Sequence, residues 1–136
     1  MSCLDICANA EDDLGQLWDD DPRAAAAVAV ALDEMNKDPN LHQTLTTYGE
    51  VEFGEQRIFI KKWVGAQRAK KGIWRFRVLD TPATGYRVVY GYHWQARQIW
   101  VLAIAKKEKL DYDHLDSDLG QRIFSDWFEI TGGEDT

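Results

Sequence analysis

Two basic side chains at alternating positions are the first feature of this sequence that could do chemistry. Arg75 and Arg77 occur in the segment 73–79, where each residue next to them is apolar. In a β-strand this alternation puts both guanidinium groups on one face, about 7 Å apart. Two arginines held in this way can bind the oxygens of a phosphate group.

More basic residues follow at the ends of the next two apolar segments. Arg87 opens one segment, and Lys106, Lys107 and Lys109 follow the other. Tyr112 and His114 come directly after these lysines. Cationic groups beside an aromatic ring suit a phosphate backbone with a base that can stack. His114 is in addition a candidate for proton transfer near neutral pH.

Each of these residues also has a purely structural interpretation. The arginines could form a solvated strand face that pairs with acidic residues, and the lysines could form a charged loop. Tyr112 could be a half-buried anchor for that loop. The sequence leaves both interpretations open.

The charge of the chain is distributed in blocks. The net charge is −7, yet residues 1–56 carry 13 acidic and 2 basic residues, and residues 57–109 carry 2 acidic and 13 basic residues. Residues 110–136 are acidic again. Either the acidic ends fold over the basic middle, or the middle forms a cationic cleft for an anionic ligand. A pI near 4.9 argues against general binding to nucleic acid.

Other classes of site have no signal in the sequence. It contains no P-loop, dinucleotide-binding glycine motif, nucleophile elbow or zinc-protease motif. Cys3 and Cys7 have no partners at metal-ligand spacing, so we expect reduced thiols in a cytoplasmic protein, with no metal and no cofactor. No apolar run is long enough to span a membrane, and the first residues do not resemble a secretory signal.

The elements that would position the basic residues begin with helices. The length of 136 residues is typical of one domain. The acidic N-terminal segment 1–21 includes a short amphipathic helix or turn at 11–20, and Asp21 is expected to cap a helix over 22–36. The helix over 22–36 would bury Val28, Leu32 and Met35.

The hydrophobic period then changes to that of strands. A hairpin around Gly54 is predicted over 50–53 and 57–63, followed by strands over 73–79, 86–92 and 99–105. The last strand is apolar on both faces and is expected to be central. A helix over 118–128 and a frayed tail at 130–136 complete the chain. The predicted fold class is α+β, with N-terminal helices packed on a small antiparallel meander sheet whose other face is more open.

Residues 72–113 resemble the strand core of the RelE/ParE toxin superfamily. In that family a strand with alternating basic residues precedes a Gly-Tyr-Arg-apolar-apolar-Tyr strand and an apolar strand with a basic exit. The second element matches Gly85-Tyr86-Arg87-Val88-Val89-Tyr90, and the third matches 99–105 followed by Lys106-Lys107-Glu108-Lys109. The two preceding helices also fit the family order.

The resemblance implies a bacterial type II toxin that a cognate antitoxin protein neutralises. RelE-like members cleave mRNA on the ribosome without a metal, by attack of the ribose 2′-hydroxyl on the adjacent phosphate. The family's paired basic residues on the strand align with Arg75 and Arg77. Its phosphate-binding arginine aligns with Arg87. The basic residue that follows the family's last strand aligns with Lys107, and the family's terminal tyrosine aligns near Tyr112. Lys106, Lys109 and His114 would add contacts to RNA.

The chain also departs from the family pattern. The family's strand pair is often lysine, and arginine cannot release a proton, so only His114 is left as a candidate base. The insertion around 41–66 and the acidic N-terminal segment are additions that could either cover the basic face or form a different partner surface. Two alternatives to the endoribonuclease hypothesis are a ParE-like toxin that binds DNA gyrase, and a non-toxic binding protein whose basic face is neutralised internally.

Overall fold

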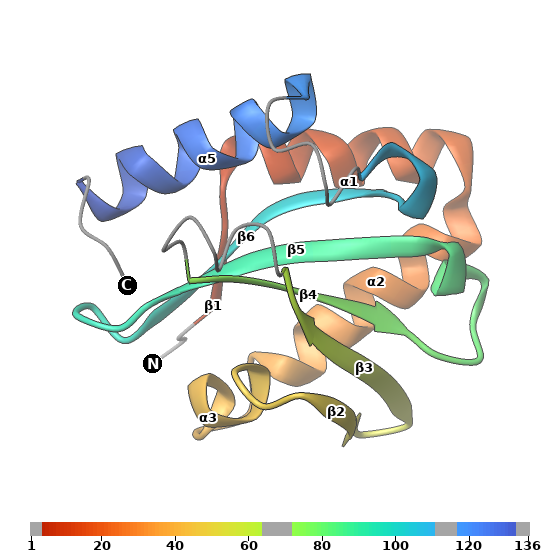
Figure 1. Ribbon diagram of the computed structural model, residues 1–136. Helices are drawn as coiled ribbons and strands as arrows, with labels where there is room; N and C mark the ends of the chain where they lie inside the picture. Colours follow the sequence, from red (N-terminus) through yellow and green to blue (C-terminus); the bar gives the residue numbers. More distant parts are fainter. Residues whose placement is uncertain (1–3, 64–71, 111–116, 133–136) are drawn as a thin grey trace.

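A six-stranded mixed sheet forms the centre of the molecule, in the strand order β1-β6-β5-β4-β3-β2 (Figure 1). The computed structural model describes residues 4–63, 72–110 and 117–132. The strands are β1 (Leu4–Ile6), β2 (Gly49–Phe53), β3 (Gln56–Lys62), β4 (Ile73–Val78), β5 (Tyr86–His93) and β6 (Gln98–Lys106). The expected α+β class and the antiparallel meander are confirmed, because β2 to β6 pair in sequence order.

The first strand was not predicted. β1 is only three residues long and pairs in parallel with β6, so the sheet is mixed and not purely antiparallel. A strand this short has too few residues to show a period of two. β6 pairs with β1 on one side and β5 on the other, so it is an interior strand, as expected for segment 99–105.

Four α-helices pack around the sheet in the part of the chain that the structure describes. They are α1 (Ala8–Asp20), α2 (Pro22–Met35), α3 (Leu41–Leu45) and α5 (Asp118–Thr131), with 3-10 turns η1 (Pro82–Gly85) and η2 (Lys107–Lys109). Asp21 caps α2 as predicted, since its side chain accepts a hydrogen bond of 3.2 Å from the Ala24 N–H. α5 continues past residue 128, so the first two residues of the expected frayed tail are helical. None of the described helices is long and apolar enough to cross a membrane.

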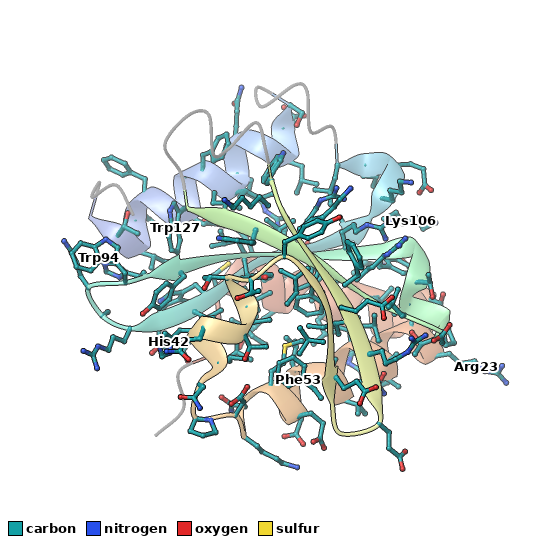
Figure 2. The ribbon with its side chains drawn as sticks, turned by 60° about the horizontal axis from the view of Figure 1, so that its bottom comes forward. Arg23, His42, Phe53, Trp94, Lys106 and Trp127 are labelled. Atoms are coloured by element: carbon teal, nitrogen blue, oxygen red, sulfur yellow. The ribbon has the colours of Figure 1, made fainter. Side chains whose placement is uncertain are left out.

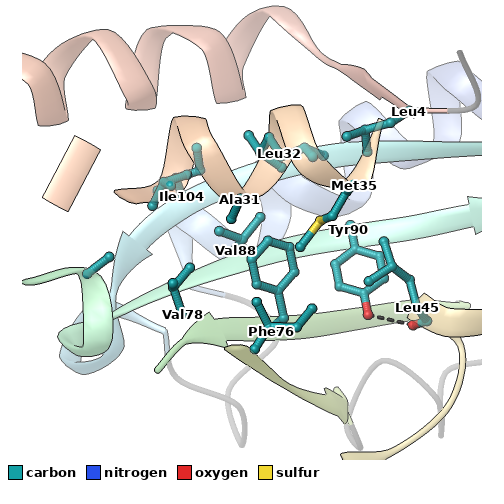
Figure 3. Packing of buried hydrophobic residues seen from close by; sticks show 14 of the residues in the cluster. Leu4, Ala31, Leu32, Met35, Leu45, Phe76, Val78, Val88, Tyr90 and Ile104 are labelled. Carbon is teal, nitrogen blue, oxygen red and sulfur yellow. Dashed lines mark hydrogen bonds between the residues drawn. The ribbon is translucent and has the colours of Figure 1, made fainter. Parts of the chain in front are cut away.

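One face of the sheet packs on the N-terminal helices. Leu32 and Met35 of α2 are buried against Phe76 and Tyr90 of the sheet (Figure 3). The Tyr90 hydroxyl donates a hydrogen bond of 2.5 Å to the Leu45 carbonyl, which ties α3 to this core. Burial raises the pKa of Tyr90 well above its usual value, so this hydroxyl keeps its proton.

α5 covers part of the second face, and a cleft lies on the part that α5 leaves open, so this face is more open than the first, as expected. Ile123 and Trp127 of α5 are buried with Val89 of β5 and Leu102 of β6. The helix can approach this closely because Gly91 has no side chain. A Cβ atom at Gly91 would lie 2.6 Å from the Trp127 ring.

Side chains from two helices close the edge of β6 beyond β1. Asp13 of α1 accepts a hydrogen bond of 3.0 Å from the Ile104 N–H, and Arg122 of α5 donates one of 3.2 Å to the Leu102 carbonyl. Asp13 and Arg122 also form a bidentate pair at 3.1 and 2.7 Å. This pair joins α1 to α5 and satisfies strand groups that would otherwise be exposed at a sheet edge.

Candidate functional site

The predicted alternation of β4 is confirmed. Trp74, Phe76 and Val78 are buried on the face that packs on the N-terminal helices. Arg75 and Arg77 are half-buried on the second face. Ile73 at the start of β4 belongs to the core beneath α5, whereas Arg75 and Arg77, two and four residues later on the same face, line a cleft beside that core.

The strand register aligns residues of β3 with these arginines. Phe59 lies directly opposite Arg77, and Lys61 lies directly opposite Arg75. Directly opposite residues of antiparallel strands share a face, with Cβ atoms about 5 Å apart. The register therefore adds one basic and one aromatic side chain to the arginine pair.

A cleft of about 220 Å³ lies at this point of the sheet. Its basic lining residues are Lys61, Arg75, Arg77, Arg87 and Lys107, and its aromatic ones are Tyr48, Phe59 and Phe76. Within the described ranges, no acidic side chain lines the cleft. The structure thus brings together four residues predicted from the sequence: Arg75, Arg77, Arg87 and Lys107.

Arg87 is more deeply buried than the other basic residues of the cleft. Its side chain is 5% exposed, and its Nη1 donates to the carbonyls of Thr84 and Tyr86 at 2.8 and 3.0 Å. Both carbonyls belong to the turn η1 and the strand start that follows it. The turn therefore holds this guanidinium in a fixed position in the cleft, and a pre-positioned charge needs no reorganisation when an anion binds.

Aromatic contacts connect the far wall of the cleft to Arg77. The Arg77 guanidinium lies 5.6 Å from the centroid of the Phe59 ring, within range of a cation–π interaction. Tyr48 meets the same ring edge to face, with centroids 5.4 Å apart and planes at 84°. Tyr48 is 64% exposed, so much of its ring faces solvent.

The acidic residues that the structure describes do not neutralise the whole basic block. Arg57 pairs with Glu50 and Asp80 on the surface. In contrast, Lys61, Arg77 and Lys107 form no ion pair with any carboxylate among the described residues. Many of the acids of the N-terminal third belong to α1 and α2, which pack on the opposite face of the sheet. Of the two interpretations of the charge blocks, this arrangement favours a cationic cleft.

Other predicted site residues lie elsewhere. Lys106 and Lys109 line a separate hollow of about 560 Å³ between α1 and α5, together with Asp13, Asp20 and Asp118. Figure 2 shows Lys106 at the end of β6 opposite to Trp94, which lies in the turn between β5 and β6. Tyr112 and His114 are outside the described residues.

Three residues of the cleft were missed at the sequence level: Tyr48, Phe59 and Lys61. A signal for two of them exists, because Phe59 and Lys61 alternate with the buried Ile58 and Ile60. The register that places them beside the arginines becomes visible only in the folded sheet. The insertion around 41–66 was expected to form either a cover for the basic face or a different partner surface, and its described part supplies a wall of the cleft.

The one described cysteine is not activated. Cys7 lies at the start of α1, with its Sγ 3.6 Å from the Leu102 carbonyl oxygen. Burial raises the pKa of its thiol, which disfavours the nucleophilic thiolate. Within the described part of the chain, no group of three or more His, Cys, Asp and Glu side chains could hold a metal ion.

Comparisons with known proteins give no match: no protein-family model, curated protein or solved structure is similar to this chain. The chemistry of the cleft is therefore what indicates the function. Its arginines can bind phosphate oxygens, its exposed ring can stack on a base, and its two lysines can both stabilise negative charge and exchange protons.

Proposed function

We propose that this chain is a RelE-like toxin: a metal-independent endoribonuclease that cuts mRNA on the ribosome, acts in the cytoplasm and is neutralised by a cognate antitoxin. One observation carries the proposal. Five basic side chains from three strands and the turn η2 line one cleft together with aromatic rings. Cations and exposed rings on a rigid scaffold are the features that RNA recognition requires.

The arginines would bind the phosphate at which the chain is cut. Arg75 and Arg77 line the cleft from β4, and the buried Arg87 adds a fixed charge from β5. Negative charge on the phosphate oxygens grows as the 2′-oxygen attacks, so fixed guanidinium groups stabilise the transition state more than the ground state.

The lysines would transfer the protons. A bond forms between the 2′-oxygen and phosphorus, the bond from phosphorus to the 5′-oxygen breaks, and the products are a 2′,3′-cyclic phosphate and a 5′-hydroxyl. An unprotonated amine must take the 2′-hydroxyl proton, and a protonated one must give a proton to the leaving 5′-oxygen. Arginine can do neither.

The strand order supports a division of these roles. Lys61 comes from β3 and Lys107 follows β6, whereas the three arginines come from β4 and β5 between them. Attacking and leaving oxygens lie on opposite sides of phosphorus in an in-line displacement. We assign proton acceptance to Lys61, which lies directly opposite Arg75, and proton donation to Lys107.

Induced expression in a bacterial host tests the proposal, with growth and primer extension on a translated reporter mRNA as readouts. We expect growth arrest and codon-phased cuts with the wild-type chain, and neither with Arg75→Ala/Arg77→Ala. The control is Arg23→Ala/Arg57→Ala, which removes the same charge from exposed positions outside the cleft and should stay toxic.

Three other results would overturn the proposal. Arrest without cuts would favour the gyrase-binding alternative. Normal growth would favour the non-toxic binding protein. Cuts that persist in Arg75→Ala/Arg77→Ala would show that the cleft is not the site of cleavage.

A further inference from the structure

We infer that Tyr48 is a stacking platform for an unpaired base, so that the cleft binds single-stranded RNA through one base as well as through phosphate. The inference rests on the proposed function and adds a base-binding position to it. This position lies in the region that has no counterpart in the compact pattern of the RelE/ParE superfamily.

The exposure of Tyr48 is the first argument. At 64% exposure this side chain is the most exposed large hydrophobic one in the described part of the chain, and it lines the cleft. It has one aromatic neighbour, Phe59, which it meets edge to face. Phe59 orients the Tyr48 ring, and most of that ring is exposed to solvent. Such a ring can stack on a base at a low cost in conformational entropy.

The contacts of Phe59 are the second argument. The Phe59 ring lies 5.4 Å from the Tyr48 ring and 5.6 Å from the Arg77 guanidinium. Phe59 is on β3, in register with Arg77. The stacking ring and the phosphate-binding arginine therefore share one aromatic neighbour that the sheet holds in place.

The distance between Tyr48 and the arginines of β4 favours single-stranded RNA over a duplex. Tyr48 immediately precedes β2, and β2 is separated from β4 by one strand, which corresponds to roughly 10 Å across the sheet. A flexible single strand can splay one base onto Tyr48 while a neighbouring phosphate contacts Arg75. A duplex cannot do this, because its bases are stacked and paired inside the helix.

A binding experiment tests the inference with a short single-stranded RNA that carries 2′-O-methyl groups and so cannot be cleaved. Fluorescence anisotropy at low salt would measure its affinity for the wild-type chain, Tyr48→Phe and Tyr48→Ala. We expect Tyr48→Phe to bind like the wild type and Tyr48→Ala to bind about tenfold to hundredfold more weakly. Trp94→Ala, which removes another exposed ring far from the cleft, should bind like the wild type.

Abasic substitutions in the RNA make the test independent of variant folding. Each base is removed in turn, and affinity for the wild-type chain is measured. We expect one position to weaken binding to the wild type about tenfold or more, and the same position to have no effect on Tyr48→Ala.

The inference is overturned if Tyr48→Ala retains wild-type affinity, or if no abasic position distinguishes the two proteins. It is also overturned if the wild-type chain binds no RNA at all. Failure of the stacking inference is seen in RNA binding, whereas failure of the proposed toxin function is seen in growth and primer extension. The two failures are therefore distinguishable.

Discussion

The second face of the sheet has two halves that differ in what covers them. Beneath α5 the face is apolar, and Ile123 and Trp127 bury it together with Ile73 of β4, Val89 of β5 and Leu102 of β6. Over β3 and β4 the face carries Lys61, Arg75 and Arg77 and lines a cleft. The change takes place within individual strands: on β4 Ile73 is in the α5 core and Arg75 lines the cleft, and on β5 Val89 is in that core and Arg87 lines the cleft.

The two parts of this face have different roles. The part beneath α5 stabilises the fold, and the part that lines the cleft carries the charged side chains. β4 is held by its other face, where Trp74, Phe76 and Val78 belong to the core beneath the N-terminal helices. Its second face is therefore free to carry charge without loss of the fold. The half beneath α5 has no such freedom, since Trp127 and Val89 fill a closed core. Substitutions beneath α5 should lower stability, whereas substitutions in the cleft should lower activity and leave stability unchanged.

The largest effect on stability is expected in the covered half. Trp127→Ala removes a 2% exposed side chain and should lower the free energy of unfolding by about 3–5 kcal/mol. Urea unfolding followed by circular dichroism would measure it. The neighbouring Phe128→Ala removes a 61% exposed ring and should change the free energy by less than about 0.5 kcal/mol. Equal effects at the two positions would contradict the assignment of the core.

The open half should respond in activity and not in stability. Lys61→Arg replaces an amine that can accept a proton with a guanidinium that stays protonated, so cleavage should fall about a hundredfold while RNA binding persists. Lys62→Arg is the matched control, because Lys62 lies over Trp74 on the opposite face. If Lys61→Arg cleaves like the wild type, the proton acceptor is another group.

The boundary of the covered half depends on the pair between Asp13 and Arg122. Asp13→Ala leaves Arg122 without its carboxylate and the Ile104 N–H without its acceptor, so stability should fall by about 2 kcal/mol. The exposed neighbour Asp12→Ala should be close to neutral. Thermal unfolding of both variants would measure the difference, and a neutral Asp13→Ala would remove this pair from the account of how α5 is held.

The smallest effect concerns pH and the core opposite the cleft. Burial raises the pKa of Tyr90, so the folded chain keeps this proton while the unfolded chain loses it above about pH 10. The stabilisation is complete below that pH and is lost as the pH rises further. Above pH 10 the wild type should therefore lose about 1 kcal/mol per pH unit more than Tyr90→Phe, measured by urea unfolding across the pH series. Parallel profiles would show that Tyr90 does not ionise on unfolding.

Much of the fold was predictable from local patterns. The alternation in 73–79 identified β4 and both of its faces, and Asp21 before Pro22 marked the start of α2. β1 and α3 were missed, because three and five residues are too few to establish a period. β1 also pairs in parallel with a strand that lies more than 90 residues away in the chain, a contact that no local pattern encodes.

The sequence by itself determined which side chains could bind phosphate and which face of β4 they share, because strand geometry fixes the direction of alternate residues. The tertiary structure decided which of them meet. Register placed Lys61 and Phe59 beside the arginines, and the exit from β6 placed Lys107 in the cleft and Lys106 outside it. α5 decided where the cleft ends, because the same sheet face is a core where a helix covers it and a charged surface where none does.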